Sequence, residues 1–91
     1  MDDRIKQIAT NYGVDCQIET LKREMKELDD AVCEYTEVEN TYTIGHLVEE
    51  MQDVKIVIDQ LSLLLNQDLA DWWRDYKLDR QIVRMENENS K

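Results

Sequence analysis

The scarcity of turn-forming residues is the feature that most constrains the fold of this chain. Its 91 residues include no proline and only two glycines, so few positions favour the tight turns that join short strands. Phenylalanine is absent and aromatic residues make up only 7% of the sequence, so most of the aromatic side chains that favour strands are missing. A β-sandwich or β-barrel is therefore disfavoured, and the sequence predicts an all-α fold.

Apolar residues recur at helical spacing through most of the chain. They predict a short N-terminal helix and three longer helices, with no internal repeat and no domain boundary over residues 1–86. The expected elements are a first helix ending at Gly13, a helix over about residues 16–35, a loop over 37–45, a helix over 46–66, a helix over 68–86 and a frayed tail over 87–91.

The predicted third helix indicates that the chain associates with other copies. Its second half, from Ile56 to Leu65, is apolar on more than one side, which a helix packed at a single interface does not need. A chain of 91 residues also buries only about two thirds of its unfolded surface. We therefore expect four-helix-bundle-type packing completed by oligomerisation.

The charge balance limits the classes of partner. With 21 acidic and 11 basic residues the formal charge is −10, so nucleic-acid backbones and anionic membrane surfaces would be repelled. No apolar run approaches the ~18 residues of a membrane span, and the polar N-terminus does not resemble a secretion signal. Cys16 and Cys33 form no metal-ligand motif and are expected to be reduced, partly buried thiols. A cytoplasmic protein is expected.

Two pairs of acidic residues are the features that point to chemistry. Glu24 and Glu27 are three residues apart in the second predicted helix, and Glu50 and Asp53 have the same spacing in the third. Each pair therefore shares one helix face, beside the apolar stripe. If the two helices form an antiparallel hairpin in which facing residue numbers sum to about 82, the four carboxylates can form one cluster.

Such a cluster has two interpretations. Each like-charged pair at ~5 Å would repel by roughly 3 kcal/mol at an effective dielectric of about 20, and a divalent cation would relieve that repulsion. Oxygen ligands without His or Cys favour Mg²⁺ or Mn²⁺ over Zn²⁺. Alternatively, the acids form an ordinary solvated flank, or basic neighbours neutralise them; these neighbours are Lys22, Arg23, Lys26 and Lys55.

The acidic motifs and their surroundings resemble the MazG-like all-α nucleoside triphosphate pyrophosphohydrolases. That family carries E-x-x-E on one helix and E-x-x-D on the next, and here 22 residues separate the two motifs. Further similarity lies in three stretches, Tyr12-Gly13-Val14-Asp15-Cys16-Gln17, His46-Leu47-Val48-Glu49-Glu50-Met51-Gln52-Asp53-Val54 and Tyr76-Lys77-Leu78-Asp79-Arg80-Gln81. The chain departs from the family at Arg23, where an additional acid is common.

The resemblance implies that the protein is a homodimer or homotetramer. It also implies that the protein hydrolyses a (deoxy)nucleoside triphosphate to the monophosphate and pyrophosphate. On this basis Mg²⁺ is bound by Glu24, Glu27, Glu50 and Asp53, and a water activated at the metal attacks the α-phosphorus. One glutamate, Glu27 or Glu49, would orient that water. Arg23 leaves open a catalytically inactive MazG-like scaffold.

The last predicted helix offers candidate ligands for the phosphates. Lys77 and Arg80 share one face with Trp73 and Arg84, and both can pair with phosphate oxygens. The alternative for these bases is pairing with nearby acids such as Asp75 and Asp79. A second function class also remains open, because an acidic helical interaction protein, such as a nucleic-acid mimic, would carry a similar negative charge.

Overall fold

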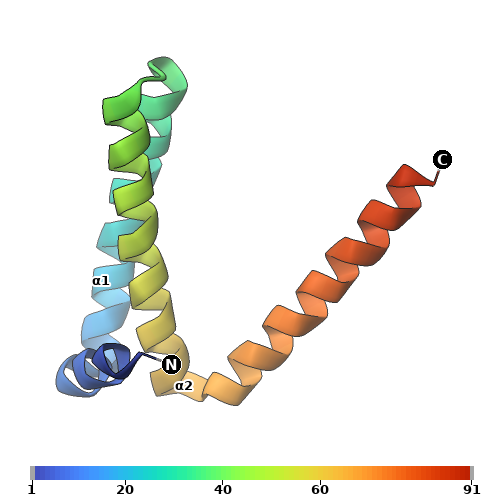
Figure 1. Ribbon diagram of the computed structural model, residues 1–91. Helices are drawn as coiled ribbons and strands as arrows, with labels where there is room; N and C mark the ends of the chain where they lie inside the picture. Colours follow the sequence, from blue (N-terminus) through green and yellow to red (C-terminus); the bar gives the residue numbers. More distant parts are fainter. Residues whose placement is uncertain (1, 91) are drawn as a thin grey trace.

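The computed structural model describes residues 2–90 and confirms an all-α protein. Figure 1 shows two long helices, α1 over Asp3–Glu37 and α2 over Thr41–Asn89. The part of the chain that the structure describes contains no strand. Neither helix within it has an apolar stretch long enough to cross a bilayer.

The prediction of four helices is wrong, because two of the expected breaks are bends within continuous helices. Gly13 has φ 81° and ψ 175°, a backbone conformation that is essentially restricted to glycine, and it turns α1 without a connecting loop. Asn66 is extended, with φ −174° and ψ 97°, and its side-chain oxygen accepts a hydrogen bond from the Leu69 amide at 3.0 Å. This bond caps the next turn, so α2 resumes at once.

The loop predicted over residues 37–45 is much shorter in the structure, where only residues 38–40 separate the helices. Asn40 begins α2 with a capping box: its side chain accepts from the Thr43 amide at 2.9 Å, and the Thr43 hydroxyl accepts from the Asn40 amide at 3.0 Å. Two otherwise unpaired backbone donors are thereby satisfied. The cap draws Thr41–Gly45 into the helix despite their modest helix propensities.

Between the two bends, α1 and α2 form an antiparallel hairpin, which we define as residues 14–65 (Figure 1). Few apolar side chains of the hairpin are buried; they are Ala31, Val54, Val57 and Leu61. Ala9, in the part of α1 before Gly13, is buried as well. The side-chain amides of Gln17 and Gln60 are buried and hydrogen-bonded to each other across the hairpin. Because an unpaired buried amide is costly, this pair helps to fix the register of the two helices.

Beyond Asn66 the helix α2 leaves the hairpin, and we call this segment, residues 67–89, the arm (Figure 1). Every side chain from Asp71 to Ser90 is exposed. The four-helix-bundle packing expected from the sequence is therefore not formed, since nearly half of α2 projects from the hairpin. The helix also extends through Asn89, so residues 87–89 of the expected frayed tail are helical, while Lys91 lies outside the described residues.

Candidate metal centre

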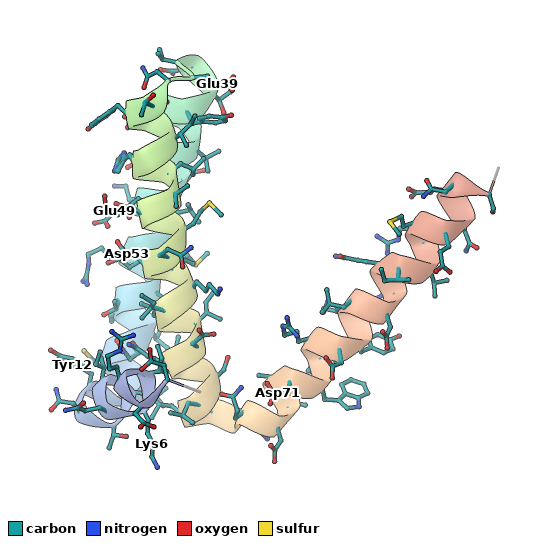
Figure 2. The ribbon with its side chains drawn as sticks, viewed as in Figure 1. Lys6, Tyr12, Glu39, Glu49, Asp53 and Asp71 are labelled. Carbon is teal, nitrogen blue, oxygen red and sulfur yellow. The ribbon has the colours of Figure 1, made fainter. Side chains whose placement is uncertain are left out.

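The hairpin brings the two acidic motifs together at its middle. One carboxylate oxygen each from Glu24, Glu27 and Glu50 lie within 4.8 Å of one another, and Glu49, Glu50 and Asp53 form a second such group. Glu50 belongs to both groups and is only 8% exposed. Figure 2 shows Glu49 and Asp53 on the same side of α2, halfway along the hairpin.

The register of the two helices in the hairpin differs from the expected one by a few residues. The hydrogen-bonded pair Gln17 and Gln60 has residue numbers that sum to 77, and Glu34 and His46, 3.3 Å apart, sum to 80. The expected sum of about 82 placed the chain reversal too late, because it assumed a loop up to Gly45. The shorter loop moves Glu27 towards Glu50 and away from Lys55.

Mutual repulsion and burial perturb the acids of this cluster. The pKa of Glu24 lies above its ordinary value, first because burial disfavours its charged form and then because the Glu27 carboxyl group lies close to it, while the charges of Asp53 and Glu50 add to the rise. Burial likewise raises the pKa of Glu50, and the charges of Glu27 and Asp53 add to that rise. Both shifts follow from burial and from the mutual repulsion of neighbouring carboxylates.

Two carboxylate oxygens in the cluster have no hydrogen-bond partner. These are Oε2 of Glu24 and Oε2 of Glu50, both buried. Within residues 2–90, no lysine or arginine forms an ion pair with any of the four predicted ligands. Direct ion pairs with basic neighbours therefore do not neutralise the cluster in the described part of the chain. Converging carboxylate oxygens without partners are what a hard divalent cation requires.

His46 also contacts the cluster, although it was not among the predicted site residues. Its Nε2 lies 3.4 Å from Oε1 of Glu50, and its Nδ1 lies 3.3 Å from Oε2 of Glu34. The contact with His46 opposes the rise in the pKa of Glu50. His46 contacts only Oε1 of Glu50, so Oε2 of Glu50 stays without a hydrogen-bond partner. The spacing of four residues between His46 and Glu50 was the sequence signal for this contact.

The predicted phosphate ligands do not join this cluster within one chain. Lys77 and Arg80 lie on the arm, where the Lys77 ammonium is 5.8 Å from the centre of the Trp73 ring and the Arg80 guanidinium is 6.0 Å from that of Tyr76. The arm diverges from the hairpin (Figure 1). Neither base forms an ion pair with Asp75 or Asp79 among the described residues.

Two other features lie outside the cluster. Cys16 and Cys33 are free thiols, but both are exposed, so their expected partial burial is wrong. An apolar cavity of about 380 Å³ lies at the bend around Asn66 between the hairpin and the arm, which we call the elbow. Its lining includes Leu21, Leu61, Leu65 and Trp73. This cavity has no acidic residue in its lining and is separate from the cluster.

No protein-family model, curated protein or solved structure matches this chain. The MazG-like assignment thus remains a prediction from the motifs of the sequence.

Proposed function

We propose that the protein is a Mg²⁺-dependent nucleoside triphosphate pyrophosphohydrolase. The observation that supports this function is the convergence of Glu24, Glu27 and Glu50 within 4.8 Å, with two buried oxygens unpartnered. The carboxylates come from two helices and face one another without a neutralising lysine or arginine within the described residues. This donor set suits Mg²⁺, with Mn²⁺ as a substitute.

The proposed reaction is hydrolysis at the α-phosphorus. Mg²⁺ held by Glu24, Glu27, Glu50 and Asp53 would lower the pKa of a nearby water and neutralise phosphate charge. The water oxygen bonds to the α-phosphorus, the bond from that phosphorus to the bridging oxygen breaks, and pyrophosphate leaves. A carboxylate accepts the proton of the water. Glu49 suits this role because it is exposed at the edge of the cluster, and Glu27 is the alternative.

The proposal extends to the substrate phosphates and to the assembly. Lys77 and Arg80 are proposed to bind phosphate oxygens, and the working form is proposed to be a homo-oligomer. The arm supports an oligomer because its large apolar side chains are exposed, for example Trp72 at 57% and Val83 at 56%. The two exposed free thiols are consistent with a reducing cytoplasmic location.

A nucleotide hydrolysis assay in ¹⁸O-labelled water tests the proposed function. The protein is incubated with ribo- and deoxyribonucleoside triphosphates and Mg²⁺, and the products are identified by mass spectrometry. We expect monophosphate carrying the label, together with unlabelled pyrophosphate. Glu50→Gln should reduce turnover by at least about 100-fold, whereas Glu37→Gln, an exposed acid near the end of α1, should retain it. Orthophosphate as the first product, or label in pyrophosphate, would contradict attack at the α-phosphorus.

A second candidate function is supported by the exposed arm. An acidic interaction protein would use the aromatic residues Trp72, Trp73 and Tyr76, which contact one another on the arm, to bind another protein. This function takes precedence if no nucleotide is hydrolysed and Mg²⁺ leaves the melting temperature unchanged. An inactive MazG-like scaffold would instead bind Mg²⁺ without turnover.

A further inference from the structure

Beyond its first turns, the arm is a helix whose apolar side chains are largely left uncovered within one chain. All residues from Asp71 to Ser90 are exposed, although seven large apolar side chains lie among them: Trp72, Trp73, Tyr76, Leu78, Ile82, Val83 and Met85. In proteins, most helical stability comes from packing of an apolar face, and short isolated helices are marginal in water. The arm therefore needs a surface that covers it.

The distribution of charge indicates which surface that is. The hairpin carries 13 acidic and four basic residues, a formal charge of −9. The arm has six acids and four bases, a charge of −2, but its bases are concentrated in residues 76–85, which carry one acid and three bases, a charge of +2. Each copy of the chain thus presents one strongly acidic surface and one short basic surface. A second copy offers the complementary charge without any other partner.

Helix lengths place the basic segment of the arm level with the acidic cluster of such a second copy. Asp53 lies 13 residues before Asn66 on the hairpin, and Lys77 and Arg80 lie 11 and 14 residues after it on the arm. At 1.5 Å per residue these distances from the elbow are about 20 Å and about 17–21 Å. If the elbows of two copies meet at a two-fold axis, each arm can lie along the other hairpin with these groups level.

The contact area is sufficient for such a pair. A helical segment of 20 residues, such as 71–90, is about 30 Å long and about 10 Å wide, so it covers roughly 300 Å² on each of the two facing surfaces. Two-fold symmetry repeats the contact, which gives roughly 1,200 Å² in total and reaches the range of stable interfaces. The exposed hairpin residues Met25, Met51 and Ile58 supply apolar surface for it.

We propose that the arm of one copy docks on the hairpin of a second copy and places Lys77 and Arg80 beside the acidic cluster of that copy. The role of these two bases in binding triphosphate there rests on the proposed function, whereas the docking does not. The aromatic contacts with Trp73 and Tyr76 hold both cations at the border between the apolar and the polar part of the interface.

Cross-linking with a carbodiimide tests this placement without any need for activity, because the reagent joins an amine to a carboxylate that already lies in contact. Unlabelled and ¹⁵N-labelled chains are mixed, allowed to exchange at low concentration, concentrated and treated in metal-free buffer. We expect links from Lys77 to Glu27, Glu49, Glu50 or Asp53, with about half of the linked peptide pairs joining a labelled to an unlabelled chain. Lys77→Arg keeps the charge and should abolish these links while the dimer mass is retained.

The proposal is overturned if Lys77 links to the cluster only within one chain, if it links to none of these acids in a dimeric protein, or if the protein is a monomer at 100 μM. Mixed-isotope links in a protein that hydrolyses no nucleotide would support the docking and reject the proposed function.

A mixture of Glu50→Gln chains with Lys77→Ala/Arg80→Ala chains tests the shared site in an active protein. Recovery of about a quarter of the native turnover is expected, and no recovery overturns the placement.

Discussion

At the scale of single residues, Glu50 is the centre of the candidate site. It is the most buried of the clustered acids at 8% exposure, it belongs to both carboxylate groups, and one of its oxygens is unpartnered. In the absence of metal, Glu50→Gln removes a charge that burial and neighbouring acids disfavour. We therefore expect this variant to melt at a higher temperature than the native protein in metal-free buffer, although it loses activity.

The matched control is Glu37→Gln, which makes the same chemical change at an exposed position. Its melting temperature should stay close to that of the native protein. A lower melting temperature for Glu50→Gln in differential scanning calorimetry would show that the carboxylate stabilises the metal-free fold, contrary to the repulsion inferred here.

The raised pKa values of Glu24 and Glu50 predict the pH dependence of stability. Both carboxyl groups bind protons more tightly in the folded chain than at their ordinary pKa of 4.5, so their contribution to the free energy of unfolding falls as the pH rises from about 4.5 through the folded values. The melting temperature of metal-free protein should decrease across this window, and Mg²⁺ should restore it at neutral pH. A Glu24→Gln/Glu50→Gln variant should lack this part of the profile; identical profiles would refute the prediction.

Sequence periodicity was sufficient to find the residues of the cluster but not all of their contacts. The spacing of three in Glu24/Glu27 and Glu50/Asp53 fixes a shared helix face whatever the helix ends are. The contact of His46 with Glu34 and Glu50 depends on the hairpin register, which one capping residue sets. Asn40 lies in a polar stretch that was interpreted as a loop, and so the predicted register was wrong by a few residues.

At the scale of elements, the bends distinguish the observed helices from the predicted ones. A glycine within a helical pattern usually indicates a helix end, and Gly13 was interpreted in that way. The structure shows that its positive φ redirects α1 instead. Sequence alone does not separate these outcomes, because both need the same residue type. Asn66 likewise has two roles: its extended backbone interrupts α2, and its side chain caps the first turn of the arm.

The two glycines provide a matched pair of substitutions. Gly13→Ala forces a side chain into a φ of +81° and should lower the free energy of unfolding by about 1–3 kcal/mol. Gly45→Ala replaces a glycine in a helix where the added methyl group meets no atom within 4 Å, and should raise it by about 0.5–1 kcal/mol. Urea denaturation measures both, and equal effects would show that Gly13 does not require its backbone conformation.

At the scale of the whole molecule, the arm is the feature that a single chain leaves unexplained. Both tryptophans, Trp72 and Trp73, lie on it and are exposed, so their fluorescence reports on whether the arm is covered. If copies associate through the arm, the emission maximum should shift to shorter wavelength as protein concentration rises, in parallel with the mass from sedimentation. Emission typical of exposed indole in a protein of dimer mass would place the interface elsewhere.

Titration of Mg²⁺ into metal-free protein, measured by calorimetry, shows whether the acidic cluster of the hairpin binds a divalent cation. The native chain and Glu37→Gln should show the same saturable binding, whereas Glu50→Gln should lose at least about 10-fold in affinity. Equal affinity in all three proteins would mean that Mg²⁺ is attracted only by the overall charge of −10, and it would contradict a metal site at Glu24, Glu27, Glu50 and Asp53.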